Sequence, residues 1–397
     1  MMKKSISVFC AVATAVSFSF SCTRPEKNIF LERAGKTMEA IYDCYASEGT
    51  FLLRENYPFD EEYRAGYLAS QEQASKGNPY SYLWPFSGTL SAVAAIMESE
   101  PSWQDTLESR VLPGLREYLD CSRKPCAYSS YINSAPMSDR FYDDNVWLGI
   151  DFTDLYVLTG KKDYLEQAEM IWKFIESGTD DVLGGGIYWC EQKKHSKNTC
   201  SNAPGAVYAL KLYKATGDKA YLESGKSLFD WTLSTLKDTT DALYLDNISL
   251  DGKIADWKFA YNSGQMVQAA SLLYGITGEN KYLEEAQQTA RACYGYFFED
   301  YESEEGISMK ILKKGNVWFS AVMLRGLIEL YRIDGNSEYV DAVRNTLEVA
   351  WDKGRSEEGL FGDSFKNVDK DKKKWLLTQG AMAEMYARFA ALDISRK

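Results

Sequence analysis

The sequence predicts an all-α protein, an (α/α)6 toroid of six inner and six outer helices. Three observations support this fold class: a short phrase with a central Gly recurs along the chain, apolar and amphipathic segments alternate around it, and six segments of each kind can be counted. An open superhelical solenoid of helix pairs is the alternative. The toroid is preferred because long, chemically distinctive stretches precede most of the apolar segments, whereas solenoid repeats tend to be uniform.

The N-terminus is typical of a targeting segment. Lys3 and Lys4 precede a mostly apolar stretch, 5–20, that is too short for a stable membrane span. Ser21 is followed by Cys22, and a small residue before a cysteine is the pattern of a bacterial lipoprotein, in which that cysteine is acylated. Plain secretion is the alternative. The predicted organisation is a lipoprotein signal peptide over 1–21, a tether over 22–28 that begins with the lipidated Cys22, and one large domain over 29–397.

The recurring phrase is a helix–turn–helix joint. Its Gly ends one helix in a left-handed cap, and the polar residues after it begin the next helix. After the first joint, apolar residues from Tyr164 to Ile175 form one stripe of an amphipathic, outer helix. Before it, 146–158 is apolar nearly all round, as expected of a buried, inner helix. The joints have Gly at 160, 217, 278 and 335.

The same reasoning places all twelve helices. We expect outer helices over 29–46, 104–120, 163–178, 220–236, 281–297 and 338–352. We expect inner helices to begin near Trp84, Asp144, Asn202, Asn262, Trp318 and Thr378. Little of the chain is typical of sheet, and the two candidates for short strands within loops are 184–189 and 242–244.

Charge and histidine content exclude several classes of function. The formal net charge of −12 argues against nucleic acid and anionic membrane surfaces as partners, and leaves neutral substrates open. The chain has one histidine, His195, which excludes ordinary Ser–His–Asp and Cys–His catalysis and a His-rich metal site. No phosphate loop or dinucleotide fingerprint is found. We therefore expect no cofactor and no metal, and a solvated His195.

Carboxylates remain as candidate catalysts, and Asp143–Asp144 is the best pair. It lies at the start of an inner helix among aromatic residues, where the helix dipole stabilises one ionised carboxylate. Crowding raises the pKa of the second carboxyl, which keeps its proton. Adjacent residues also favour the short separation of a retaining glycosidase. The alternative is a helix cap followed by a first-turn acid.

Other acidic groups are interpreted structurally. We expect Asp180–Asp181 to belong to a turn, and the 60–62 run to be solvated. Asp151 and Asp154 lie within an inner helix, need partners, and are candidate supports behind the catalytic pair. Cys190 and Cys200 bracket one loop, which leaves two alternatives: a disulfide joins them, or both are small buried thiols.

The segments that precede the inner helices mix aromatic rings with amides and hydroxyls. Because the inner helices of a toroid begin on one face, these segments meet there. Rings stack on sugars, and amides bind hydroxyls. The alternative is that Asn, Ser and Thr are helix N-caps, which does not explain the rings.

These motifs together resemble glycoside hydrolase family 76, the endo-α-1,6-mannanases. Phe141–Trp147 closely resembles the family signature, and further support comes from 82–86, 128–131, 184–189 with 197–202, and 261–264. The resemblance implies an (α/α)6 enzyme that cleaves the α-1,6 backbone of α-mannan with retention, with Asp143 as nucleophile and Asp144 as acid/base. Ser263 departs from the family pattern, where Gln is expected.

The expected partner is an α-mannan polysaccharide or oligosaccharide, and the membrane is contacted only through the lipid anchor. Transglycosylation is an alternative to hydrolysis. Two other functions remain open: a non-catalytic surface glycan-binding lipoprotein, and another (α/α)6 carbohydrate-active enzyme. The candidate substrate-binding residues are Tyr82, Trp84, Tyr142, Tyr188, Trp189, Lys197, Asn198, Asn202, Tyr261 and Asn262.

Overall fold

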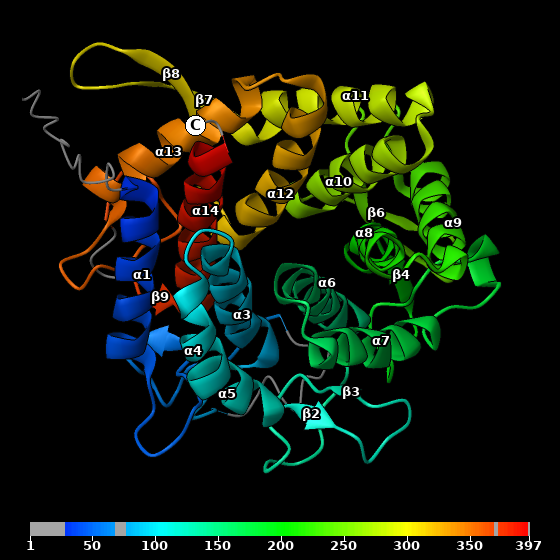
Figure 1. Ribbon diagram of the computed structural model, residues 1–397, viewed down its shortest axis with the longest axis horizontal. Coiled ribbons are helices and arrows are strands. Elements are labelled where there is room, and N and C mark those ends of the chain that lie inside the picture. Colours follow the sequence, from blue (N-terminus) through cyan, green and yellow to red (C-terminus); the bar gives the residue numbers. More distant parts are fainter. Residues whose placement is uncertain (1–27, 68–76, 369–371, 396–397) are drawn as a thin grey trace, which may run out of the picture.

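The computed structural model describes residues 28–67, 77–368 and 372–395, and within them six inner helices are enclosed by six outer segments (Figure 1). The (α/α)6 prediction is confirmed. The inner helices are α3 (Leu83–Met97), α6 (Tyr142–Thr159), α8 (Thr199–Thr216), α10 (Ala260–Thr277), α12 (Val317–Asp334) and α14 (Leu376–Ser395). The outer helices are α1 (Ile29–Tyr45), α7 (Lys162–Glu176), α9 (Lys219–Leu236), α11 (Asn280–Phe297), α13 (Glu338–Val349) and an interrupted segment of α4 (Gln104–Thr106) and α5 (Leu112–Arg116).

Irregular turns extend several of these helices. A π-helical turn over Leu107–Val111 joins α4 to α5, and another over Ala350–Gly354 continues α13. Short 3₁₀ turns occur at Pro101–Trp103 and Val182–Gly184. The outer helix predicted over 104–120 is therefore an α-helical segment with a π-helical turn in its middle, and it ends at Arg116 because Leu119–Asp120 form a short strand.

The ring closes on itself, which excludes the solenoid. The last inner helix, α14, packs against both α1 and α3 at the start of the domain, and the helices form a complete circle in Figure 1. In a solenoid the first and last repeats would be far apart. Closure also brings β1 (Asn56–Tyr57) beside β9 (Lys374–Trp375) in an antiparallel pair.

The recurring phrase forms the predicted joint four times. In each case the Gly adopts a left-handed conformation that closes the inner helix, and its N–H donates to the carbonyl of a tyrosine four residues earlier. The pairs are Gly160 with Tyr156, Gly217 with Tyr213, Gly278 with Tyr274, and Gly335 with Tyr331.

Neighbouring inner helices approach closely where glycines face each other. A Cβ added to Gly264 of α10 would lie 2.4 Å from the Cα of Met323 in α12, and one added to Gly326 would lie 2.1 Å from the carbonyl oxygen of Gly264. No side chain fits in these gaps. The narrow ring of inner helices therefore depends on glycine at these two positions.

In the part of the chain that the structure describes, sheet is confined to short antiparallel pairs between helices, one of which a third strand extends. The predicted strands 184–189 and 242–244 form only isolated bridges, through Ile187, Tyr188 and Tyr244. The hairpins that do form were not predicted, because their strands are five residues long and partly polar. They are β5 (Leu245–Ser249) with β6 (Ile254–Lys258), which β4 (Ser196–Asn198) extends, and β7 (Phe298–Glu302) with β8 (Ser308–Leu312); β2 (Leu119–Asp120) with β3 (Ala127–Tyr128) is shorter.

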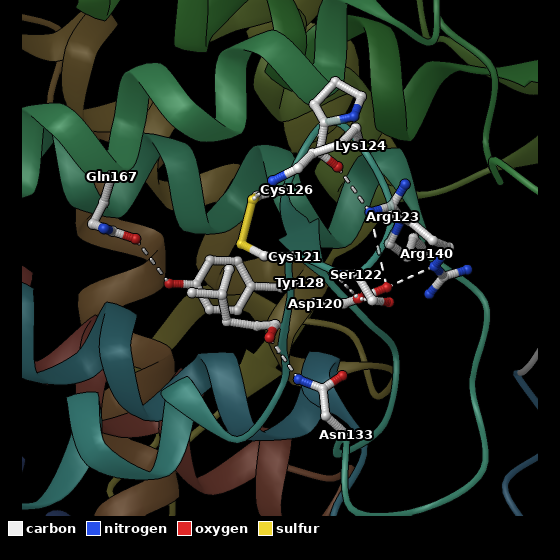
Figure 2. Close-up of a disulfide and its surroundings, with 12 residues drawn as sticks. Asp120, Cys121, Ser122, Arg123, Lys124, Cys126, Tyr128, Asn133, Arg140 and Gln167 are labelled. Carbon is white, nitrogen blue, oxygen red and sulfur yellow. Dashed lines mark hydrogen bonds and ion pairs between the residues drawn. A yellow bond between two sulfur atoms is a disulfide. The ribbon is translucent and has the colours of Figure 1, made fainter.

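The disulfide joins Cys121 and Cys126, across the turn between β2 and β3 (Figure 2). Cys190 and Cys200 are both buried free thiols, so of the two alternatives the bridge is wrong and the pair of small buried thiols is confirmed. A bridge between residues only five positions apart was not signalled by any spacing pattern in the sequence.

The disulfide-closed turn is part of an ion network that leads to α6. Asp120 accepts from Arg123 Nε at 2.6 Å, and its carboxylate lies 3.9 Å from the guanidinium of the fully buried Arg140 (Figure 2). Arg140 Nη1 also donates to the carbonyl of Pro125 at 2.9 Å. Arg140 lies two residues before the start of α6, so this network anchors the chain where the candidate catalytic helix begins.

The predicted signal peptide and the lipidation site Cys22 lie outside the described residues. Among the helices that the structure describes, none is long and apolar enough to cross a membrane.

Candidate active site

A cavity of about 580 Å³ opens on the face of the ring where the inner helices begin. First turns of α3, α6, α8, α10 and α12 form its wall, together with the loops and the β4–β5–β6 sheet beside them. More than half of the described residues that line it are aromatic, and most of the others are polar. Pockets with this mixture are typical of saccharide binding, because rings stack on the apolar faces of sugars.

Asp143 and Asp144 both line this cavity from the first turn of α6. The helix begins here because Phe141 has extended backbone, and the N–H of Tyr142 donates to the carbonyl of Trp189 at 2.9 Å. First-turn N–H groups lack acceptors within the helix and favour negative charge nearby. The position therefore stabilises one carboxylate in a partly buried setting.

Three donors converge on Asp143. Trp189 Nε1 donates to Oδ2 at 2.9 Å, the thiol of Cys200 lies 3.4 Å from the same oxygen, and the N–H of Asp144 donates to Oδ1 at 2.9 Å. Within the described part of the chain, no group donates a hydrogen bond to the side chain of Asp144. The two neighbouring carboxyls therefore have different environments.

This difference in environment gives the two carboxyls different pKa values. Burial raises the pKa of Asp143 to about 6, although the hydrogen bonds from Trp189, Asp144 and Cys200 lower it. Burial and the charge of Asp143 raise the pKa of Asp144 well above its usual value. Asp143 thus loses its proton first, and its negative charge then helps Asp144 to retain one.

Cys200 supports Asp143 as a neutral donor. Burial and the adjacent charge of Asp143 raise the pKa of the Cys200 thiol well above its usual value, so that it stays protonated. Tyr261, on α10, interacts with the same sulfur, and burial raises its pKa as well. Asp143 is therefore flanked by uncharged hydrogen-bonding groups rather than by a cation.

The floor of the cavity is a cluster of rings held edge to face. The indole of Trp318 lies 5.4 Å from that of Trp84 and 5.0 Å from that of Trp147, with interplanar angles of 83° and 90°. Tyr261 stacks on Phe319 at 4.1 Å. Rings packed in this way keep a fixed orientation, and a sugar that binds above them meets a rigid surface.

Five of the ten candidate substrate-binding residues line the cavity. Asn198 comes from β4 and Trp189 from the preceding loop, and the rest come from the starts of inner helices. The five are Tyr82, Trp84, Trp189, Asn198 and Tyr261.

The other five candidates are buried and are not among the residues that line the cavity. Tyr142, Tyr188, Lys197, Asn202 and Asn262 are each at most 3% exposed. Tyr142 stacks on Phe174 of an outer helix, and Tyr188 donates to Asp180. Lys197 donates to Asp180 and to the carbonyls of Val182 and Gly185, which fixes the glycine-rich loop.

Asn202 belongs to a set of polar side chains that attach the preceding loops to the inner helices. Its amide binds both backbone groups of Ile187, and Asn145 binds those of Tyr128 in the same way. The amide of Gln379 likewise binds both backbone groups of Phe361, and Ser263 Oγ accepts from the N–H of Tyr244. Asn202 therefore holds a loop against its inner helix, and the Ser263 departure changes a loop contact.

Sequence reasoning missed several lining residues. Tyr67 and Ser130 come from long loops, and Asp246, Asn247 and Trp257 come from the unpredicted β5–β6 hairpin. Trp257 is 64% exposed at the rim. Phe141, Trp147, Phe259 and Trp318 lay in segments already recognised, where the excess of aromatic residues was a sufficient signal. Ser130 and Cys200 lay in motifs of the family resemblance.

The remaining acidic candidates lie elsewhere. Asp180 caps the 3₁₀ turn at Val182, as expected of a turn, and Glu61, Glu62 and His195 are exposed. Asp151 and Asp154 have partners, as predicted, but they line a separate cavity. They do not support the Asp143–Asp144 pair directly.

Comparisons with known proteins decide the family. The sequence profile of Glycosyl hydrolase family 76 matches residues 62–312. The chain belongs to glycoside hydrolase family 76. A family 76 mannosidase from Bacteroides thetaiotaomicron VPI-5482, Bt3792, is 33% identical, with a TM-score of 0.84 over 93% of this chain and 100% of that one.

Two other relatives add information on activity. An inactive variant of the α-1,6-mannanase GH76A from Salegentibacter sp. HEL1_6, with two consecutive aspartates replaced by asparagine, was solved with α-1,6-mannotriose. It is 26% identical, with a TM-score of 0.70 over 91% of this chain and 99% of that one. The mannan endo-1,6-alpha-mannosidase DCW1 of Saccharomyces cerevisiae is 25% identical over 126 residues, 30% of this chain and 28% of that protein.

Proposed function

We propose that this glycosidase is an endo-acting α-1,6-mannanase that cleaves α-mannan with retention. The observation that carries the proposal is the pair Asp143–Asp144, which lies in an aromatic cavity with two different protonation tendencies. Family membership and the α-1,6-mannanase relative with bound mannotriose support the substrate class. The chain's net charge of −12 is compatible with a neutral polysaccharide.

The proposed mechanism uses each carboxyl in one role per step. Asp144 donates its proton to the glycosidic oxygen while ionised Asp143 attacks the anomeric carbon, and the bond to the leaving chain breaks. A covalent mannosyl–Asp143 ester remains. Asp144, now a carboxylate, takes a proton from water, whose oxygen attacks the anomeric carbon and releases Asp143. A sugar hydroxyl in place of water would give transglycosylation.

A glycan-binding protein without catalytic activity is the second candidate function. The raised pKa values of Asp143 and Asp144 argue against it. Burial raises the pKa of both carboxyls, which shows that holding their charges here is unfavourable. A binding site can be built from neutral groups without that cost. Pairs of acids with strongly shifted pKa values occur preferentially at catalytic sites.

Product analysis tests the proposal. We expect debranched α-1,6-mannan to yield a ladder of shorter oligosaccharides, because an endo-acting enzyme cuts internal bonds. Proton NMR early in the reaction should show new reducing ends that form first as the α-anomer, since two inversions retain configuration. Products born as the β-anomer would contradict retention, and the absence of new reducing ends on several mannans would contradict the activity.

We also propose export as a membrane-anchored lipoprotein at the cell surface or in the periplasm. The signal-like segment before Cys22 supports this. Replacing Cys22 by serine should move the protein from the membrane fraction to the soluble exported fraction, whereas an unchanged distribution would show that this cysteine carries no anchor.

The two raised pKa values predict a bell-shaped pH profile. Asp143 must be ionised to attack, so kcat/KM should fall as pH drops through about 6, where Asp143 takes up a proton. Asp144 must be protonated to act as an acid, so activity should fall again at higher pH, where it loses its proton. Initial rates on a soluble α-1,6-mannooligosaccharide measure both limbs. Activity that keeps rising below pH 6 would contradict this assignment.

Cys200 should influence the pH at which activity falls on the acidic side of that profile, the acidic limb. Cys200→Ala removes a donor to Asp143, so the pKa of Asp143 should rise and the limb should move upward by less than about one pH unit. Cys200→Ser supplies a stronger donor and should move it downward. Cys293→Ala, at an equally buried thiol on α11, is the matched control and should leave the limb unchanged. Equal effects of Cys200→Ala and Cys293→Ala would mean that only packing was disturbed.

A further inference from the structure

A second cavity, of about 510 Å³, lies at the end of the ring opposite Asp143 and Asp144. All six inner helices line it from their C-terminal halves, and it shares no described lining residue with the active-site cavity. Its volume is within the range of small-molecule sites and far above that of a single water molecule. Neither the family resemblance nor the proposed mechanism accounts for it.

In this cavity a buried hydrogen-bond donor of Arg325 faces an oxygen of Asp151, but the two atoms are too far apart for a direct hydrogen bond. Arg325 is 4% exposed, and its Nη1 has no hydrogen-bond acceptor among the described residues. The nearest carboxylate oxygen is Oδ1 of Asp151, at 3.8 Å, while the other oxygen of Asp151 accepts from Ser91 at 2.5 Å. A gap of 3.8 Å is too long for a direct hydrogen bond. A hydroxyl oxygen beside the pair, about 2.8 Å from each atom, can bridge them, because it accepts from Arg325 and donates to Asp151.

The charges around the cavity favour a neutral ligand. The described lining contains five basic and four acidic side chains, and Glu384, which accepts from Arg325, supplies a fifth carboxylate beneath them. The C-terminal halves of six helices add a weak negative field. An anion would meet this field and the carboxylates, and a cation would meet the guanidinium of Arg325. A ligand with no net charge avoids both penalties.

The remaining lining suits a molecule with many hydroxyls. Gln268 adds an amide, which both donates and accepts, and Lys211 is held by Asp154 at 2.6 Å. Ala95, Leu272 and Ile328 supply apolar surface between these polar groups. Alternating polar and apolar surface is what a sugar ring presents. We propose that this cavity is a second binding site, for a neutral polyhydroxylated molecule of the size of a mono- or disaccharide.

The site can be tested at its mouth without touching the active site. Leu158 is 43% exposed and lines the opening, so that Leu158→Trp should obstruct the cavity while the fold is kept. Leu158→Ala is the matched control, which widens the opening. Gln268→Leu removes an amide from the wall. Saturation-transfer NMR titrations of D-mannose against these three variants and the unmodified protein measure binding, and hydrolysis should be unchanged in Leu158→Trp.

We expect a saturable D-mannose signal in the unmodified protein and in Leu158→Ala, with affinity about ten-fold weaker or lost in Leu158→Trp and Gln268→Leu. D-mannosamine and D-mannuronate, which carry opposite charges on the same ring, should bind no more tightly than D-mannose. Identical titrations in all four proteins would overturn the proposal, because the signal would then come from the active site alone. Clearly tighter binding of either charged analogue would overturn the assignment of a neutral ligand. The proposal does not depend on the mannanase activity, since an inactive protein can be titrated equally well.

Discussion

Replacing Asp143 by asparagine is expected to lower kcat on α-1,6-mannan by more than about a thousand-fold. Asparagine keeps the size of the side chain and one accepting oxygen for either Trp189 or Asp144, but it cannot form the ester intermediate. Asp144→Asn should lose the proton donor and the later base, and its first step should recover on substrates whose leaving group needs no protonation. Steady-state rates on mannan and on an aryl mannoside distinguish the two defects.

The control for this prediction is the other acidic pair. Asp181 is exposed and lies in a turn, so Asp181→Asn should keep full activity. Loss of activity in Asp181→Asn equal to that in Asp143→Asn would mean that the catalytic pair has been assigned to the wrong residues.

Asp143→Asn should not weaken the fold. Burial raises the pKa of Asp143 from 3.8 to about 6, so the native state binds this proton more tightly than the unfolded chain does. The stability contributed by this group is therefore present below about pH 4 and is lost as pH rises through 6. At pH 7 the charged form destabilises the native state, and the neutral amide removes that cost, which offsets the loss of one of the two accepting oxygens. Thermal unfolding at pH 7 should show an equal or higher midpoint, and a large decrease would contradict this account.

The ring could be predicted from sequence because its signals are local and repeated. Gly160, Gly217, Gly278 and Gly335 each end an inner helix in the conformation that glycine favours, and the contrast between apolar and amphipathic segments separates inner from outer helices. Asp143 and Asp144 were found for a similar reason. Their place at a helix start among aromatic residues is visible within seven consecutive residues, Phe141–Trp147.

The individual binding residues were less predictable, because residue type does not reveal the direction of a side chain. Asn198 and Asn202 are four residues apart on one segment, yet Asn198 lines the cavity and Asn202 binds the backbone of Ile187. Trp257 reaches the rim only because the β5–β6 hairpin folds back over the helix starts. Such placement depends on pairing between distant segments, which local patterns do not encode.

The largest stability effect is expected at Glu384, on α14 at the second cavity's floor. This carboxylate is 1% exposed and accepts from Arg325 at 2.7 and 2.8 Å and from Arg388 at 2.7 Å. Burial raises its pKa, but the two guanidiniums outweigh burial and lower it to about 2. Glu384→Gln keeps the shape and leaves two buried cations without their shared anion. We expect a loss of about 3–5 kcal/mol in the free energy of unfolding.

The pH dependence of that loss separates charge from packing. Because the pKa of Glu384 is lower in the native state than the usual 4.5, its stabilising effect is complete above about pH 4.5 and disappears as pH falls through 2. The difference in denaturation free energy between Glu384→Gln and the unmodified protein should therefore be largest at neutral pH and shrink towards pH 2.

Glu329→Gln is the matched control. Glu329 lines the same cavity, is partly exposed and has no ion-pair partner among the described residues, so this substitution should lower the free energy of unfolding only slightly. A loss for Glu384→Gln that is below about 1 kcal/mol, or that stays constant with pH, would mean that Arg325 and Arg388 are held by packing and by their other partners rather than by this carboxylate.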